Sequence, residues 1–376
     1  MNTRWGYLTA IIIVIVIVIL VVMAYRSGLN GNSDSGVSIM NIETGPDRPD
    51  LLNGRMVVWS TDANVPAEIS MDENENDPDS AGTGDGAFPF DLNIGRDRVR
   101  DEWNVAAYQF GLGSRMDTLA YLTENSGTYT HPDPGGAYVV ATVTRDGSQD
   151  IARISIETGE VEVIAYSHSI DRWPSITADG SNVIFHSFRD QNPAGDLYLA
   201  HEPSAEGFEW DIIRLTDSSE YEYIWPEISD SGTFVVAFER RIGEESGRVI
   251  RWELVDDQLT NAEYCYEEPR DVQFPTVCDR GWLVSWQENV DGLWKIALVN
   301  LVTGTFEYLG PDENYDGPGW IQPGIAPDGK FVVFVADTEE YGDDRIGIFD
   351  LTERNVVYLP DPEGTVMFPA MTGREE

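Results

Sequence analysis

A repeating unit of forty to fifty residues runs through most of this 376-residue chain. Each copy has an aromatic or polar residue, a proline, a short stretch with Ile or Val, a turn with Asp or Gly, and a run of β-forming residues. The copies cover residues 173–187, 225–239, 274–288 and 322–336, with a looser copy at 131–142. The repeat prolines at positions 132, 174, 226, 275, 323 and 369 are spaced 42, 52, 49, 48 and 46 residues apart. This period, with several short strands in each unit, indicates a β-propeller.

Each unit continues with two further predicted strands, so that four strands form one blade. The last proline copy, at residues 368–373, is not followed by the rest of a blade. Matching strands lie at the opposite end of the repeat region, at 53–60, 103–110 and 118–124. We therefore predict an all-β fold, a six-bladed propeller with four-stranded blades, in which the C-terminal strand closes blade one and hides the sheet edges.

The repeats resemble those of the TolB-like propeller family, whose unit centres on a proline, a short strand, an Asp-Gly turn and an apolar strand. The resemblance covers roughly residues 55–373. The Asp-Gly turn is intact at 179–180 and 328–329, whereas Ser-Gly and Arg-Gly replace it at 231–232 and 280–281. The resemblance implies a six-bladed propeller. It does not imply one function, because related propellers occur as TolB, as gating domains of prolyl oligopeptidase-like peptidases and as oligogalacturonate lyases.

An uncharged apolar run occupies residues 8–23, with Trp5, Tyr7 and Tyr25 beside it. As a helix, the segment from Trp5 to Tyr25 would be about 30 Å long, which matches the hydrocarbon core of a bilayer. A cleaved signal peptide is the alternative, but no convincing small-residue cleavage site follows the run. We therefore predict a transmembrane signal-anchor helix at 7–25, which makes this a single-pass protein of the cell membrane.

The charges beside the predicted helix set its expected orientation. Arg4 and the N-terminal amine precede the helix, whereas Arg26 alone follows it closely. By the positive-inside rule, residues 1–6 then form a short cytoplasmic N-terminus and the C-terminal domain is extracytoplasmic. Residues 26–50 are rich in Gly, Ser, Asn and Asp, which is typical of a flexible linker. The propeller is expected at 51–376.

The chain is very acidic, with 66 Asp and Glu against 24 Lys and Arg and a formal net charge of −42. Lysine occurs only at Lys295 and Lys330. Such a surface repels phosphate backbones and cannot gain affinity by releasing their counterions, so nucleic acid is not an expected partner. Adaptation to high salt explains the composition better than a dedicated cation-binding function does, because the acidic residues are spread evenly.

A long acidic insertion, at residues 61–102, separates the second and third predicted strands of blade one. It offers alternating oxygen ligands for a calcium ion at Asp72, Asn74, Asn76, Asp77 and Asp79. The glycine expected at the sixth position of a calcium loop is missing, and Thr83 stands where the acidic twelfth ligand belongs. A solvated acidic loop is therefore the preferred interpretation, and calcium the alternative. No other cofactor is expected.

One residue before each repeat proline recurs at the start of an innermost strand. These residues are His131, Trp173, Trp225, Phe274, Gln322 and Phe368. Aromatic rings at the mouth of a propeller channel could stack on a sugar or hold a peptide, so the set is a candidate ligand-binding site. The preferred interpretation is structural, with the rings wedged between neighbouring blades. The four histidines show no metal-binding spacing.

The chain has two cysteines, Cys265 and Cys278, thirteen residues apart. That number excludes a disulfide scaffold and a Cys-rich metal site. The two residues could form one disulfide in an oxidising compartment, or remain as two buried thiols.

These observations favour a non-catalytic protein-binding or scaffold module, which engages a protein partner of the envelope or of a membrane complex. The alternative is a carbohydrate-active enzyme, a polysaccharide lyase or hydrolase, with its site in the central channel. Convergence of carboxylates, Arg and His at one end of the channel would favour the enzyme. A structural subunit of a membrane complex is a third class. A peptidase is excluded because the chain has no G-x-S-x-G elbow and no room for a hydrolase domain.

Overall fold

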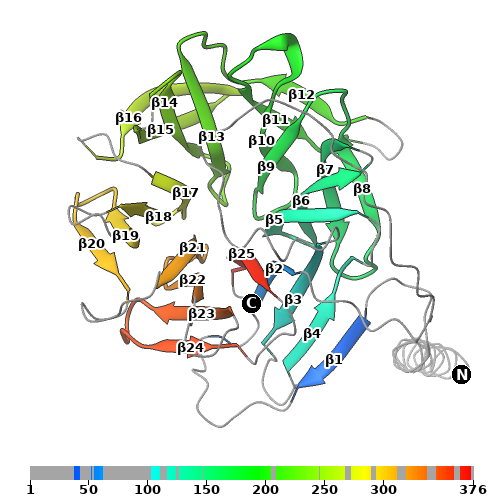
Figure 1. Ribbon diagram of the computed structural model, residues 1–376, viewed down its shortest axis with the longest axis vertical. Helices are drawn as coiled ribbons and strands as arrows, with labels where there is room; N and C mark the ends of the chain where they lie inside the picture. Colours follow the sequence, from blue (N-terminus) through cyan, green and yellow to red (C-terminus); the bar gives the residue numbers. More distant parts are fainter. Residues whose placement is uncertain are drawn as a thin grey trace, which may run out of the picture. The chain divides into compact units, whose positions relative to one another are not determined.

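The computed structural model describes residues 38–42, 52, 55–61, 103–110, 117–123, 127–145, 147–204, 209–244, 246–266, 272–288, 294–310, 319–336, 344–359 and 365–373. These residues form six antiparallel sheets around a central axis, which is a six-bladed β-propeller (Figure 1). The segment Val37–Glu376 is one compact unit. The prediction of an all-β propeller with six blades is confirmed.

Each blade has four strands that run from the axis outward. The innermost strands are β25 (Val366–Met371), β5 (Thr128–Gly135), β9 (Asp171–Ile176), β13 (Tyr221–Ile228), β17 (Val272–Val277) and β21 (Trp320–Ile325), for blades one to six. The second strands are β2 (Met56–Thr61), β6 (Tyr138–Arg145), β10 (Asn182–Ser187), β14 (Phe234–Arg241), β18 (Trp282–Glu288) and β22 (Phe331–Ala336).

The two outer positions complete the blades. The third strands are β3 (Asn104–Gln109), β7 (Ser148–Ser155), β11 (Asp196–His201), β15 (Gly247–Val255), β19 (Trp294–Asn300) and β23 (Arg345–Asp350). The fourth strands are β4 (Asp117–Tyr121), β8 (Val161–Ala165), β12 (Asp211–Arg214), β16 (Gln258–Tyr264), β20 (Phe306–Leu309) and β24 (Val356–Tyr358). A short 3-10 helix, η3 (Arg189–Gln191), lies between β10 and β11.

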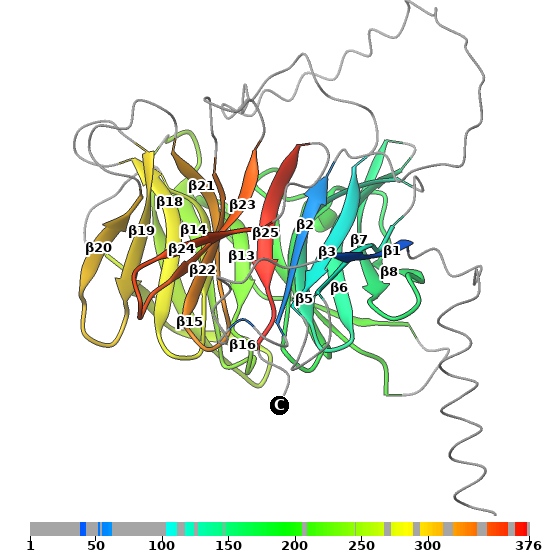
Figure 2. The same ribbon diagram turned by 90° about the horizontal axis from the view of Figure 1, so that it is seen from below.

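Blade one joins the two ends of the propeller. Strand β25 pairs with β2 in antiparallel register, with Val57 opposite Met371 and Val58 opposite Ala370. The amide of Thr372 donates to the carbonyl oxygen of Met56 at 2.9 Å. Figure 2 shows the two strands side by side. The closure predicted from the unmatched last repeat is therefore confirmed.

Blade one also has a fifth strand, β1 (Ser38–Ile42), which pairs with the outer edge of β4. This strand lies within residues 26–50, where a flexible linker was predicted. The outer edge of a sheet presents unpaired backbone groups, and a short extended segment of the same chain can satisfy them. The linker prediction therefore does not hold for these five residues.

No helix among the described residues is long and apolar enough to cross a membrane. The predicted signal-anchor helix at 7–25 and the cytoplasmic segment at 1–6 lie outside the described residues, as does the acidic insertion beyond Thr61.

The hydrophobic core lies between neighbouring blades. The second strands are buried on both faces, so their sequences are mostly apolar. In β22, for example, all six residues are buried. Between blades one and six, for example, Val57 and Trp59 pack with Phe331 and Val333. Because each sheet covers the next, the stability of the ring depends on its closure.

The innermost strands all run in the same direction through the disc, which gives the propeller two distinct faces. We call the face where these strands begin the start face and the face where they end the end face. Thr61 and Asn104 lie on the start face, because they pair with each other and Thr61 also pairs with Val366 at the beginning of β25. The tight turns after the innermost strands lie on the end face.

Candidate functional site

Each innermost strand has a β-bulge at its repeat proline. The residue before the proline has a positive φ, between 49° and 56°, and the pairing register with the adjacent strand shifts at the same place. Proline cannot donate to the ladder, and the left-handed residue before it turns the chain. These six residues are His131, Trp173, Trp225, Phe274, Gln322 and Phe368. Strained non-glycine residues gather at functional sites, and here they occupy one equivalent level of the channel.

Five of these side chains are rings that touch one another around the axis. Ring centroids are 5.7 Å apart for Trp173 and Trp225, 5.1 Å for Trp225 and Phe274, and 5.6 Å for Phe274 and Phe368. Phe368 lies 3.7 Å from His131, and His131 lies 6.4 Å from Trp173. His131 of blade two is also 6.2 Å from Phe274 of blade five, across the axis. We call these five rings the aromatic collar, and it narrows the channel at this level.

The aromatic collar and Gln322 line a cavity of about 100 Å³, which we call the axial cavity. The Oε1 atom of Gln322 accepts a hydrogen bond from the amide of Phe368 at 2.8 Å. All six residues of the predicted channel-mouth set therefore meet at one place. The rings line the axial cavity, and Trp173, Trp225, Phe274 and Phe368 also pack against the hydrophobic clusters between blades, as the preferred interpretation expects. Ligand binding at this set stays a prediction.

A polar row follows the collar toward the end face, because the residue after the repeat proline is polar in four of the six blades, at Asp133, Ser175, Glu227 and Thr276. Three side chains of this row accept hydrogen bonds from a backbone amide of the next blade. Asp133 accepts from Ile176 at 2.8 Å, Ser175 from Ile228 at 3.2 Å, and Thr276 from Ile325 at 3.1 Å. The row ties neighbouring innermost strands together and satisfies amides that face the channel.

Carboxylates on the end-face side of the collar have raised pKa values. Burial raises the pKa of Asp133 to about 6, against a hydrogen bond from Ile176 that lowers it. Burial, with the charge of Asp133 added, raises the pKa of Glu227 well above its usual range. The pKa of Asp230 is raised to about 7 by burial and by the charges of Asp133, Asp279 and Asp328. Carboxylates with pKa values perturbed in this way are candidate residues of a functional site.

The cationic groups near the channel have lowered pKa values. Burial lowers the pKa of Arg172 to about 10. Burial and the charge of Arg172 lower the pKa of His131 to about 3, so this ring is neutral near pH 7. Arg172 immediately precedes Trp173 of the collar, and its guanidinium lies 4.6 Å from that ring. His131, Asp133 and Glu227 line the same axial cavity, and the charge of Arg172 acts on His131.

A wider pocket opens on the end face, and we call it the acidic funnel. Its volume is about 420 Å³, and its wall includes Pro134, Gly135, Ala178, Asp230 and Pro327. Asp133 lines the axial cavity and the next residue, Pro134, lines the acidic funnel, so the two spaces follow one another along the axis. The funnel is wider than the axial cavity, and its volume suits the end or a side chain of a partner.

The sequence analysis did not select Asp133, Glu227 or Asp230. A signal for the first two was present, because the residue after the repeat proline is acidic in blades two and four. Position alone could not show that these carboxylates share one channel with Asp230, which belongs to a turn. The possible calcium ligands Asp72, Asn74, Asn76, Asp77 and Asp79 lie outside the described residues. Among the described residues, no group of three metal-ligating side chains is placed to hold a metal ion.

The possible disulfide between Cys265 and Cys278 is absent, and both cysteines are free. Cys265 follows the outermost strand of blade four, where its amide bonds to Val249, whereas Cys278 follows the innermost strand of blade five. The first position is at the rim on the start face and the second is near the axis on the end face. Strands adjacent in sequence therefore do not bring the two thiols together.

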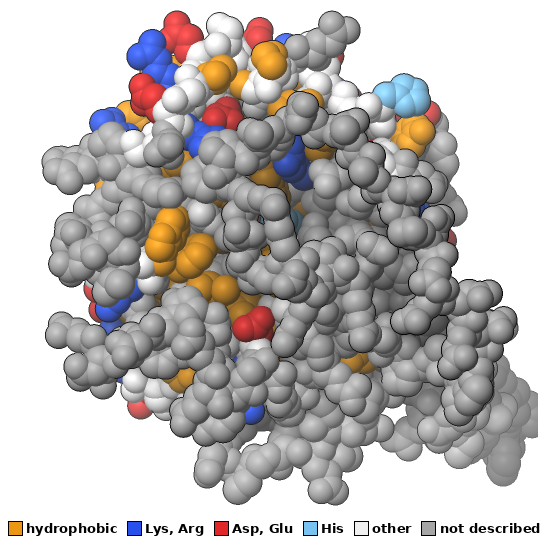
Figure 3. All heavy atoms as spheres, in the orientation of Figure 1, with side chains coloured by type: hydrophobic (Ala, Val, Ile, Leu, Met, Phe, Trp, Pro, Cys, Tyr) orange, Lys and Arg blue, Asp and Glu red, His pale blue; other side chains and the backbone are white. Residues whose placement is uncertain are grey.

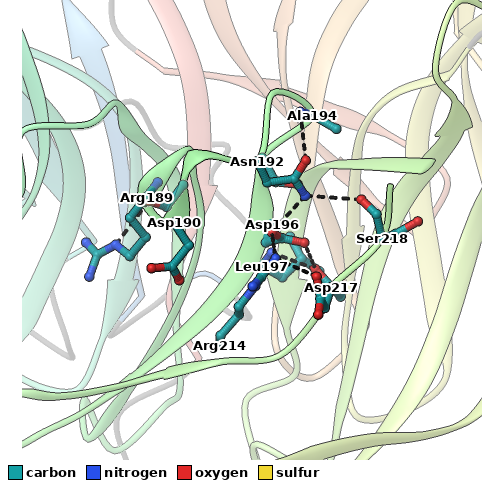
Figure 4. A network of polar contacts seen from close by, with 12 residues as sticks. Arg189, Asp190, Asn192, Ala194, Asp196, Leu197, Arg214, Asp217 and Ser218 are labelled. Carbon is teal, nitrogen blue, oxygen red and sulfur yellow. Dashed lines mark hydrogen bonds and ion pairs between the residues drawn. The ribbon is translucent and has the colours of Figure 1, made fainter. Parts of the chain in front are cut away.

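A second polar cluster, in blade three, is structural. The buried carboxylate of Asp196 accepts hydrogen bonds from Asn192 at 2.8 Å, Arg214 at 2.6 Å and Thr216 at 3.0 Å. Figure 4 shows Asn192 and Arg214 pointing toward Asp196 from opposite sides. These hydrogen bonds hold the connection between β10 and β11 against the end of β12 and the residues after it.

The start face has a different surface. Figure 3 looks onto it, and hydrophobic side chains of the described residues gather over blade five. Trp286 and Trp294 of this blade form a close pair with centroids 4.4 Å apart. Acidic and basic side chains alternate at the rim over blade four (Figure 3).

The described fold and site define a closed six-bladed propeller whose channel is narrowed by aromatic rings and lined by carboxylates on one side. This fold is that of a TolB-like propeller. The crystal structure of TolB from Acinetobacter baumannii is similar to it, with a TM-score of 0.59 and 15% identity over 86% of this chain and 68% of that chain. The structure of a putative TolB from Agrobacterium tumefaciens has a TM-score of 0.50 and 17% identity, over 65% of this chain and 85% of that one.

A chain in the crystal structure of a nidogen/laminin complex is also similar, with a TM-score of 0.51 and 11% identity, over 72% of this chain and 94% of that chain. No family model and no curated protein matches the sequence. At these identities the likeness establishes the fold, and the functional inference depends on the site itself.

Proposed function

We propose that this protein is a non-catalytic protein-binding module whose docking site is the acidic funnel on the end face. The observation that carries the proposal is the acidic funnel of about 420 Å³ on the end face, whose wall residue Pro134 directly follows Asp133 of the axial cavity. A pocket of this shape suits an extended segment of a partner, inserted from the end face. Its wall is mostly backbone turns and small residues, which leaves room for a peptide chain.

We further propose that the helix at 7–25 anchors this module in the cell membrane, with the propeller outside the cytoplasm. The support is the uncharged apolar run and its flanking charges. Removal of residues 1–25 should then release the protein from the membrane fraction into the soluble fraction. Recovery of the shortened chain in the membrane fraction after a high-salt wash would contradict the anchor.

The charge of the acidic funnel indicates the kind of partner. Asp230 lies in its wall, and Asp279 and Asp328 lie close enough for their charges to raise the pKa of Asp230. A polyanion would meet repulsion there, whereas a basic or neutral segment would not. One of the similar structures is a complex between proteins, which fits a propeller that binds another protein.

A carbohydrate-active enzyme remains the second candidate, because Asp133 and Glu227 form a neighbouring pair of carboxylates with raised pKa values. Such a pair is what glycoside hydrolysis requires. An acidic glycan, however, would have to enter between the carboxylates of the acidic funnel. Release of reducing or unsaturated ends from polygalacturonate by the purified protein would favour this candidate.

The test of the binding function is capture of partners by the full chain in mild detergent at the native salt concentration. Ala178→Trp should fill the acidic funnel, since Ala178 is an exposed residue of its wall. Val302→Trp is the matched control, because Val302 is 81% exposed on a turn of the same face but away from the funnel. We expect the wild type and Val302→Trp to retain the same partner and Ala178→Trp to lose it. Retention by Ala178→Trp would exclude the acidic funnel as the docking site.

A further inference from the structure

The axial cavity combines two chemistries that rarely line the same small space. Its wall has the faces or edges of Trp173, Trp225 and Phe274 together with the carboxyl-bearing residues Asp133 and Glu227. Aromatic rings attract a cation through their quadrupole, and carboxylates attract it through their charge. A neutral apolar ligand would leave the charge of the carboxylates uncompensated, and an anion would be repelled by them. The pairing therefore selects a compact organic cation.

Gln322 is an independent indication of a ligand in the same cavity. This side chain is 2% exposed, and its Nε2 atom has no hydrogen-bond partner among the described residues. Its Oε1 atom is already bonded to the amide of Phe368, which fixes the orientation of the side chain. A buried amide nitrogen without an acceptor costs free energy, and an acceptor that enters with the ligand would satisfy it, whereas an ammonium, which only donates, would not.

We propose that the axial cavity binds the alkylammonium group of a lysine side chain from the protein partner that enters the acidic funnel. This inference rests on the proposed function, because the funnel is the route to the cavity. Lysine carries a compact ammonium on a flexible four-carbon stem, which suits a narrow space beyond a wider pocket. A lysine side chain that enters from the end face would place its ammonium between the carboxylates of Asp133 and Glu227 and the collar rings beyond them, and its stem on the side of the acidic funnel.

Other occupants fit less well. A metal ion needs several ligating groups converging on one point, and the described residues offer no such group. A second copy of this chain is a poor source of the ammonium, because only Lys295 and Lys330 are available and Lys330 lies 3.7 Å from Asp328. A partner that is richer in lysine than this chain is therefore expected.

The surrounding charges make binding pH-dependent. The pair Asp133 and Glu227 faces Asp230, Asp279 and Asp328 on the end-face side and the cation Arg172, with neutral His131, on the collar side. The pKa of Asp133 is about 6, that of Asp230 about 7, and that of Glu227 well above its usual range. A bound ammonium favours the ionised carboxylates, so binding should release protons and weaken as the pH falls from 8 to 5.

The experiment uses the full chain in detergent and two short peptides, acetyl-Gly-Lys-Gly-amide and its norleucine counterpart, which lacks only the amine. Binding is measured by calorimetry at pH 8 and by the fluorescence of Trp173 and Trp225 in the collar. We expect the lysine peptide to bind at least about tenfold more tightly than the norleucine peptide. Titrations in two buffers with different ionisation enthalpies should show proton release.

Variants distinguish a cation site from nonspecific attraction to an acidic protein. Glu227→Gln and Asp133→Asn keep the shape of the side chains, and each should weaken binding of the lysine peptide by about tenfold. Trp225→Leu tests the collar and should weaken binding of the lysine peptide by about threefold to tenfold. Glu160→Gln is the control, because Glu160 is exposed at a turn of the same face and should bind like the wild type.

Equal binding of the two peptides, or wild-type affinity in both Glu227→Gln and Asp133→Asn, would overturn the inference. These outcomes are separate from failure of the proposed function. If Ala178→Trp loses the partner while Glu227→Gln and Asp133→Asn keep it, the acidic funnel remains the docking site and only the lysine assignment fails. If the variants fold poorly, their thermal unfolding curves will show it before any titration is interpreted.

Discussion

The ring of Phe368 stacks on the imidazole of His131, with ring centroids 3.7 Å apart and planes inclined by 26°. Phe368 belongs to β25, the strand that closes blade one, and His131 belongs to β5 of blade two. The strand that closes the propeller therefore also completes the aromatic collar. Closure of the ring and formation of the candidate site are one structural event.

Deletion of β25 should open the ring. A chain that ends after residue 364 loses the partner strand of β2 and exposes the buried edge of blade one. We expect its cooperative thermal transition to disappear or to fall by at least about 10 °C. A chain that ends after Gly373 is the control and should melt like the wild type. An unchanged transition in the shorter chain would mean that β25 does not hold the ring closed.

The ion pair between Arg55 and Asp328 should hold blades one and six together. Arg55 is 1% exposed, and its guanidinium also lies 4.9 Å from the ring of Phe331. Arg55→Met removes the cation and leaves a partly buried carboxylate, which should cost about 2–4 kcal/mol in unfolding free energy. Lys330→Met removes an exposed cation 3.7 Å from the same carboxylate and should cost less than about 0.5 kcal/mol. Chemical denaturation of both variants at one salt concentration gives the comparison.

Stability should fall as the pH rises through the range in which Asp230 ionises. Its pKa is about 7 in the folded protein and near 4 in the unfolded chain, so the folded state binds more protons between these values. Asp230→Asn removes the ionisable carboxyl, and with it this loss of stability. At pH 8 and low salt the variant should be more stable than the wild type by about 1–2 kcal/mol, after allowance for screening by solvent in the channel.

At pH 4 the stabilities of the same variant and the wild type should differ by less than about 0.5 kcal/mol, because Asp230 is then protonated in the folded state and about half protonated in the unfolded chain. Asp211→Asn, at an exposed residue of β12, should follow the wild type at both values. A variant that is less stable than the wild type at pH 8 would show that the carboxylate of Asp230 is held by favourable interactions instead.

Gly347 should not tolerate a side chain. A methyl group there would lie 2.3 Å from the ring of Phe334, which is fully buried. Gly347→Ala therefore forces the core between blades five and six to shift and should cost about 1–3 kcal/mol. A methyl group at Gly373 would meet no atom closer than 3.8 Å, so Gly373→Ala should change the stability by less than about 0.5 kcal/mol. Similar losses of stability for both variants would show that the contact with Phe334 is not the cause.

The two thiols should be free but slow to react. Burial raises the pKa of Cys265 to about 12 and also raises the pKa of Cys278. Because the thiolate is the reactive form, both cysteines should react with a thiol reagent at least about tenfold more slowly than a free cysteine at pH 8. After denaturation without a reductant, two thiols per chain should react. If no thiol reacts after denaturation, the two cysteines form a disulfide.

The repeat prolines, their spacing and the unmatched final copy were enough to determine six blades, four strands in each and closure through the C-terminal strand. These features depend on local periodicity and on the rule that sheet edges are covered, and both can be read along the chain. The repeat prolines also located the six residues that precede them, from His131 to Phe368, which lie at one level of the channel. Only the tertiary structure decided that their rings face the axis, because a bulge reverses the usual alternation of side chains.

The tertiary structure also decided which charged groups share the channel. Asp133, Glu227 and Asp230 come from separate repeats, and their pKa values are raised because folding removes them from water and brings them together. Cys265 and Cys278 illustrate the opposite case, since they are near in sequence but lie on different faces of the disc. Periodicity along a chain specifies which strands form, whereas burial and charge at the axis depend on distances between blades that the sequence order does not contain.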